Sequence, residues 1–176
     1  MIISVSEARG FVAFPESWTD KQIERKLKAI ERTIRSYTNN NFQDTEYRST
    51  ADIIGGIFVV KALCPFKAND TVNINYGKNK GVFTVTEATE TTFAVKEDVV
   101  DETEVLVTKV VYPADVIDCC LNLLEWEINF RAKVGVQSET LSRHSVTYVQ
   151  QTGDNTIEGY PVSIMSGLRK YKKARF

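Results

Sequence analysis

The sequence predicts an α+β protein in which a small helical bundle of about three to four helices carries an inserted antiparallel β-barrel-like module. Three observations support this fold class: a helical apolar stripe over residues 20–37, apolar–polar alternation over residues 44–111, and a second helical pattern over residues 113–131. We therefore expect residues 1–43 and 112–176 to form a helical core, with residues 44–111 inserted as a small β domain.

The N-terminal part of the chain predicts two helices. A short one follows residues 4–13, and a longer one begins after Thr19 or Ser17, either of which is a plausible N-cap. In the longer helix, apolar residues recur at spacings of four and three, at Ile23, Leu27, Ile30, Ile34 and Tyr37. This spacing puts them on one narrow stripe, so we expect the helix to pack on one partner helix and to end at the asparagines of residues 39–41.

Between Asp44 and Val111, short runs rich in β-branched and aromatic residues replace the helical period. We expect five strands, separated by turn sequences such as residues 55–56 and 77–81. Short strands at this spacing predict a small antiparallel barrel. The turn at residues 77–81 superficially resembles a phosphate cradle, but it has no Ser or Thr after the lysine and no following helix, so a β-turn is expected.

Pro113 is suited to the start of a long helix. The apolar surface of this helix is far wider than one stripe, so we expect its own domain to cover one side and a neighbouring subunit the other. The residues assigned to subunit packing are Val116, Ile117, Leu121, Leu124 and Ile128. Residues 144–149 alternate as a strand, and Pro161 begins a last short helix with Leu168 and Tyr171 facing inward.

The C-terminal tail differs in charge from the rest of the chain. Its last eleven residues carry five Lys or Arg and no acid, whereas residues 44–112 carry seven Lys or Arg against eleven Asp or Glu. Such a tail can bind nucleic acid or insert into another protein, and a frayed, solubilising terminus is the simpler alternative. The apolar Leu168, Tyr171 and Phe176 favour a docking tail. Its assigned residues are Leu168, Arg169, Lys170, Tyr171, Lys172, Lys173, Arg175 and Phe176.

No motif in the sequence predicts catalysis, a metal site or a cofactor. The single histidine, His144, lacks a partner pattern for a nucleophile or a metal, and Glu125 and Glu127 point to different faces of their helix. We therefore expect a protein that is not an enzyme and binds no cofactor. No apolar run approaches the roughly 18–20 residues of a membrane span, so we expect no membrane partner.

Four motifs follow one another in the C-terminal third. Tyr-Pro at residues 112–113 precedes the long helix, and residues 135–140 read Gly-Val-Gln-Ser-Glu-Thr. Residues 144–148 read His-Ser-Val-Thr-Tyr, and Tyr-Pro at residues 160–161 leads to Leu-Arg-Lys-Tyr at residues 168–171. In this order the motifs resemble the head–tail connector proteins of tailed bacteriophages, also called adaptor or head completion proteins.

Two further segments fit the resemblance. The helical residues 6–37 match the opening of the family, and residues 65–72 with residues 81–85 look like a β insert found in some relatives from phages of Gram-positive hosts. The resemblance covers roughly residues 1–43 and 112–176.

The resemblance implies a structural protein of the virion neck, made in the host bacterial cytoplasm. Its subunits would form a ring, usually of twelve, beneath the portal protein, with each tail reaching into the portal. The other face of the ring would receive the next neck protein, a stopper or tail-completion protein, and packaged DNA would pass through the lumen. The alternative is a small nucleic-acid-binding regulator that uses the basic tail.

Overall fold

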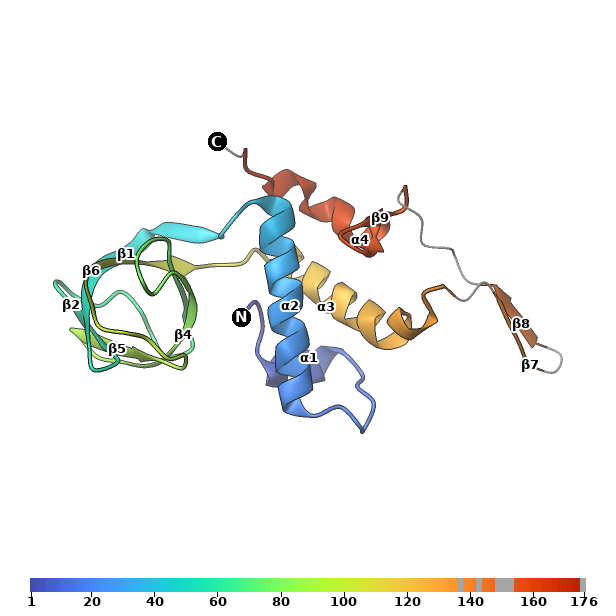
Figure 1. Cartoon of the computed structure of the whole chain (residues 1–176), viewed down its shortest axis with the longest axis horizontal. Helices are drawn as coiled ribbons and strands as arrows, with labels where there is room; N and C mark the ends of the chain where they lie inside the picture. Colours follow the sequence, from blue (N-terminus) through green and yellow to red (C-terminus); the bar gives the residue numbers. More distant parts are fainter. Residues whose placement is uncertain (136–137, 142–143, 148–153, 175–176) are drawn as a thin grey trace. The chain divides into compact units, whose positions relative to one another are not determined.

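The computed structural model describes residues 1–135, 138–141, 144–147 and 154–174 (Figure 1). In this part of the chain it shows four α-helices and a closed antiparallel β-barrel of six strands, so the predicted α+β class is confirmed. A clear helical bundle is not shown, because two of the four helices are short, with seven and four residues. No helix in the described ranges is long and apolar enough to cross a membrane.

The chain divides into two compact units. The barrel unit comprises Asn41–Tyr112 together with Met1, and the helical unit comprises Ile2–Asn40 and Pro113–Phe176. We predicted an insert at residues 44–111. The chain enters and leaves the barrel unit at neighbouring points, since the Val111 amide donates to the Phe42 carbonyl at 2.9 Å.

The barrel strands pair in the order β1-β2-β5-β4-β3-β6, and β6 closes on β1. Figure 1 shows them wrapped into a ring. Their bounds are β1 Gln43–Ile54, β2 Ile57–Val60, β3 Thr71–Ile74, β4 Gly81–Ala88, β5 Thr92–Val95 and β6 Glu102–Val110. The sequence predicted five of these strands and missed β1, because its first eight residues are polar or aromatic without regular alternation and none of them is buried.

Aromatic side chains fill the barrel. The rings of Phe58 and Phe93 stack with centroids 4.4 Å apart, and Phe66 meets Phe93 edge-on at 5.1 Å. Such pairs add specific geometry to the apolar burial that stabilises the core. The barrel is therefore held by its own hydrophobic core, whose buried members among the described residues lie between Ala51 and Val107.

The loop before β4 forms a small anion-binding turn, and a carboxylate of the same chain occupies it. The Glu102 carboxylate accepts hydrogen bonds from the backbone amides of Lys78 and Asn79 at 3.0 and 3.2 Å, and from the Asn79 side chain at 2.8 Å. These bonds, led by the Lys78 amide, lower the pKa of Glu102. A β-carbon at Gly77 would lie 2.2 Å from this carboxylate. The turn is thus a structural feature of the barrel.

The helical unit is built on two long helices. These are α2, Asp20–Thr38, and α3, Ala114–Asn129; α1, Val5–Phe11, precedes them, and α4, Val162–Met165, leads into the 3-10 helix η2, Ser166–Tyr171. A further 3-10 turn, η1, spans Arg131–Lys133, and two short hairpins pair β7, Ser138–Leu141, with β8, His144–Thr147, and β9, Thr156–Ile157, with β10, Tyr160–Pro161. β8 lies in the segment predicted as a strand.

Local signals in the sequence position α2. Thr19 is its N-cap and forms a capping box with Gln22, and Asn39 ends it in the left-handed conformation, with φ of 48°. The predicted stripe is confirmed, since its four aliphatic residues are at most 1% exposed. We expected one partner helix, but α2 contacts α1, α3 and η2.

A buried carboxylate connects α3 to α2. Glu127 is 2% exposed, and its carboxylate lies 2.6 Å from Lys26 Nζ and 3.4 Å from Arg131 Nε. The Tyr160 hydroxyl also hydrogen-bonds to it, and burial, with this bond, raises the pKa of Tyr160. The Arg131 guanidinium stacks against the Trp126 ring at 5.3 Å. The negative charge is therefore compensated inside the helical unit.

Candidate functional site

The C-terminal tail folds onto its own helical unit up to Ala174. Leu168 in η2 is 1% exposed, and η2 contacts both α2 and α3. This part of the tail is therefore packed on the helical unit and is not a free segment. Leu168 was assigned to docking on a partner, but its side chain faces inward, as the helical spacing itself had indicated. Arg175 and Phe176 lie outside the described residues.

One carboxylate at the start of α3 holds two tail residues. The Tyr171 hydroxyl donates to Asp115 Oδ1 at 2.6 Å, and the Lys170 ammonium pairs with Asp115 Oδ2. The hydrogen bond from Lys170 and then that from Tyr171 lower the pKa of Asp115, and the same contacts raise the pKa values of Lys170 and Tyr171. An acid in the first turn of a helix is also favoured by the helix dipole. Asp115 therefore positions the tail.

The C-terminal end of α2 binds the tail backbone. The Asn39 side chain donates to the Ala174 carbonyl at 3.0 Å, and the Asn40 side chain donates to the Tyr171 carbonyl at 3.2 Å. The Lys173 amide donates to the Thr38 carbonyl at 2.8 Å, which satisfies an acceptor that the helix end leaves open. These bonds use backbone groups of the tail, so they leave its cationic side chains exposed.

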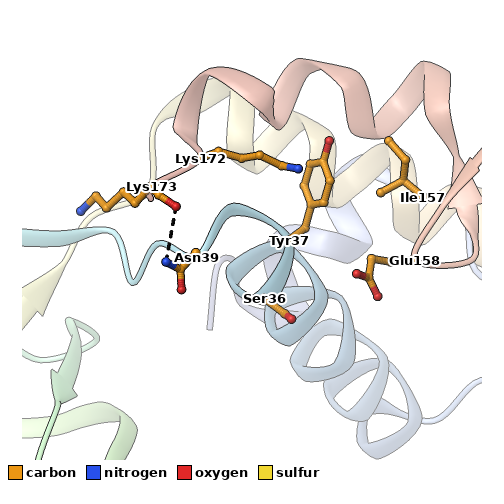
Figure 2. Close-up of a pocket in the computed structure, with 7 residues that line it drawn as sticks. All are labelled: Ser36, Tyr37, Asn39, Ile157, Glu158, Lys172 and Lys173. Carbon is orange, nitrogen blue, oxygen red and sulfur yellow. Dashed lines mark hydrogen bonds between the residues drawn. The ribbon is translucent and has the colours of Figure 1, made fainter. Parts of the chain in front are cut away.

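Figure 2 shows a pocket of about 390 Å³ where the tail crosses α2. Its lining residues are Ser36, Tyr37, Asn39, Ile157, Glu158, Lys172 and Lys173. Lys172 Nζ lies 3.8 Å from the centre of the Tyr37 ring, a cation–π contact that covers the ring, whereas the Lys173 side chain extends away from it. The pocket is thus polar and cationic on the tail side.

A second pocket, of about 540 Å³, adjoins the first. Its lining residues are Lys28, Ala29, Arg32, Thr33, Ser36 and Glu158, so the two pockets share Ser36 and Glu158. We call the joined pair the α2 groove. Cations line both of its halves, and Glu158 is the one acid among the described residues that line it. Glu158 belongs to the tight β9–β10 turn, where both it and Gly159 have positive φ.

The residues assigned to subunit packing on α3 fall into two groups. Val116 and Leu124 are 0% exposed and pack in the core of their own helical unit, so their assignment to a neighbouring subunit is wrong. Ile117, Leu121 and Ile128 are half-buried. They recur at spacings of four and seven, which places them on one face of the helix.

The two cysteines of the helical unit, Cys119 and Cys120, are buried. Desolvation raises the pKa of Cys119 to about 11 and that of Cys120 to about 12, which disfavours the thiolate. Glu125 is exposed while Glu127 is buried, as expected for different helix faces. The described residues hold no cluster of three or more His, Cys, Asp or Glu that could bind a metal ion. The side chain of His144 lies outside the described part.

Sequence reasoning missed the residues that hold the tail. Asn39 and Asn40 were interpreted only as the end of α2 and Tyr37 only as a member of the apolar stripe, and Asp115 was not singled out. The signals present in the sequence, an asparagine run and an acid beside Pro113, are local, whereas the contacts join residues 56 or more positions apart.

Comparison with known proteins adds no relative. No protein-family model matches the chain, and no curated protein matches its sequence.

Proposed function

We propose that this protein is a structural component of the neck of a tailed bacteriophage, where a ring of subunits beneath the portal joins the DNA-filled head to the tail. The order of the four motifs between residues 112 and 171 carries the proposal. Several residues of these motifs also have structural roles that support the proposal. Pro113 and Pro161 precede α3 and α4 as N-caps, and Leu168 and Tyr171 fix the tail on the helical unit. The helical unit would act as the connector bundle.

The portal-docking surface is best assigned to the outer side of the tail. Leu168 is inward and the Tyr171 hydroxyl is bound to Asp115, so these two residues hold the tail in place. Lys170 pairs with Asp115 and Lys172 lies over Tyr37, so the residues that remain for a partner are the exposed Arg169 and Lys173, followed by Arg175 and Phe176. Cations on an ordered backbone would meet acids or carbonyls of the portal with little further loss of conformational freedom.

The half-buried face of α3 supports subunit packing. Ile117, Leu121 and Ile128 offer apolar area on one side of the helix, and burying such area drives association. The face is small, so the free protein should be monomeric or weakly associated and should assemble on the portal, which brings subunits together.

The test is ring formation on the portal protein of the same phage. The full chain should decorate portal particles as a ring in negative-stain electron micrographs. A chain that stops after Tyr171 keeps Leu168 and the Asp115 contact, so it should fold, as far-UV circular dichroism would check, but lose portal binding. A matched control carries Lys67→Gln and Lys80→Gln in the barrel unit. A stable dimer without portal affinity in light scattering would contradict the proposal.

A nucleic-acid-binding regulator is the second candidate, and the cations of the α2 groove favour it. DNA binding and packing between subunits differ in their response to salt. DNA affinity through phosphate contacts falls steeply with salt concentration, whereas assembly through apolar faces does not. A tight DNA complex at physiological salt, together with no assembly on the portal, would select the regulator.

A further inference from the structure

The outer face of α2 carries a row of cations. Lys21, Arg25, Lys28 and Arg32 are all exposed and recur at spacings of four, three and four, so they lie on one side of the helix. The buried stripe that begins at Ile23 lies on the opposite side. From Lys21 to Arg32 the row spans about 16 Å, at roughly 1.5 Å per residue.

The acids of α2 do not cancel this row. Glu31 is buried, and Asp20 at the start of the helix pairs with Arg9 at 2.7 Å. Glu24 is half-buried, and its carboxylate lies 3.2 Å from Lys28 Nζ, so it offsets one cation. The surface that α2 presents to solvent therefore stays positive.

The row continues into the α2 groove. Lys28 and Arg32 line one half of the groove, and Lys172, exposed and seated over Tyr37, lines the other. We call these five cations, Lys21, Arg25, Lys28, Arg32 and Lys172, the basic face. Glu24 and Glu158 are the acids beside it, so its net charge is about +3 at neutral pH.

We propose that the basic face binds the phosphate backbone of double-stranded nucleic acid without reading its sequence. Charges spread over about 16 Å of α2, with Lys172 beyond them at Tyr37, match a linear polyanion, in which each strand carries one phosphate per roughly 3.4 Å of helix axis. In the described part of the groove the aromatic ring is that of Tyr37, and Lys172 occupies one of its faces, which disfavours base stacking there. Backbone contacts position a duplex without carrying sequence information.

The lining disfavours an acidic peptide as the occupant. A peptide interface takes most of its affinity from buried apolar or aromatic anchors in well-packed pockets. Among the described residues that line the α2 groove, Ile157 is the one large aliphatic side chain and Tyr37 the one aromatic ring, and Lys172 already lies over one face of that ring. A phosphate backbone needs cations and no such anchor.

The biological role of the basic face rests on the proposed function, since a neck ring has packaged DNA passing through it. Weak, sequence-independent contacts would align DNA without arresting it. The physical property itself does not depend on the ring, so the two ideas can fail separately. Ring formation on the portal with unchanged DNA binding by basic-face variants would overturn only the inference.

The test measures binding of the full chain to a 20-base-pair DNA duplex by fluorescence anisotropy between 50 and 200 mM salt. Five cations, partly offset by Glu24 and Glu158, should give a slope of log K against log salt of about −3 to −5. The variant with Arg25→Gln and Arg32→Gln should bind more weakly, with a slope shallower by about two. Duplexes of different sequence should bind equally well.

Matched variants make the result decisive. Lys67→Gln with Lys80→Gln removes two exposed cations from the barrel unit and should leave the slope unchanged. Glu158→Gln should strengthen binding, because it removes an acid from the groove. Equal loss in the two double variants, or no loss in either, would overturn the proposal. Tighter binding of poly-glutamate than of the duplex at equal charge concentration would also overturn it, in favour of an acidic protein partner.

Discussion

At the scale of single residues, Asp115 binds two residues of the tail, and its charge sets the pH range over which this contact stabilises the tail. A carboxyl whose pKa is lowered in the folded state adds stability above its ordinary pKa and loses it as the pH falls through the lowered value. The raised pKa of Lys170 has the opposite sign, so its contribution is complete below its ordinary pKa and is lost in strong alkali. The contact is therefore constant near neutral pH and weakens below about pH 4.

Asp115→Asn should loosen the tail without unfolding the protein. The amide keeps a hydrogen-bond acceptor for Tyr171 but cannot pair with the Lys170 ammonium. Hydrogen exchange should show faster exchange at residues 172–174 at pH 7, where wild type is protected. The wild type itself should show the same loosening below about pH 4. Asp118→Asn, an exposed acid on the same helix, is the control and should change nothing.

Glu127→Gln should destabilise the helical unit by about 1–3 kcal/mol, because a buried network loses its charge-assisted hydrogen bonds. The cost stays below that of a fully buried pair, since Lys26 and Arg131 are 41% and 46% exposed and can turn to water. Urea denaturation followed by circular dichroism measures the loss. Glu125→Gln, two residues earlier and on the exposed side of α3, should lie within about 0.5 kcal/mol of wild type.

At the scale of elements, the predictions succeed where local chemistry decides. The cap and stripe of α2 were readable because Thr19 and the periodic apolar residues act within one helix. β1 could not be predicted from the sequence, because its polar residues take strand geometry from pairing with β2 and β6. Leu124 was misassigned because an apolar position shows only that something covers it. Only the tertiary structure shows whether the residues that cover it belong to the same chain or to another.

The tail shows the same conflict between two interpretations of one residue. Helical spacing placed Leu168 inward, whereas the basic composition of the tail suggested a free anchor. Leu168→Ala should cost about 2–5 kcal/mol of unfolding free energy, the usual range for a fully buried leucine. Ala174→Ser, an exposed position in the same tail, should leave the urea midpoint unchanged. If Leu168→Ala is as stable as wild type, the tail is not attached to the helical unit through Leu168.

At the scale of the whole molecule, charge separates the two units. The helical unit carries fifteen Lys or Arg against twelve Asp or Glu, whereas the barrel unit carries seven against eleven. A polyanion is therefore repelled by one unit and attracted by the other. The acidic barrel is a poor nucleic-acid binder, which leaves the DNA contacts proposed above to the helical unit.

The two units should also fold independently. The ends of the barrel unit are held together by the pairing of Gln43 with Val110 and by the Phe42 and Tyr112 rings, whose centroids lie 5.1 Å apart. A short Gly/Ser linker can therefore span the same gap at little entropic cost. Replacing Asp44 to Val111 by such a linker should leave the helices formed, because the barrel core contains no residue of the helical unit.

The measurement has two arms. The linker variant should keep the helical far-UV signal expected for α2 and α3, and residues 41–112 expressed alone should give a cooperative thermal transition. The matched control replaces the Gly77–Gly81 turn by a Gly/Ser loop, which removes the Glu102 contacts and should destabilise the barrel while the helices stay formed. Loss of most helix in the linker variant would mean that the barrel is part of the helical core, and the inserted-domain prediction would be wrong.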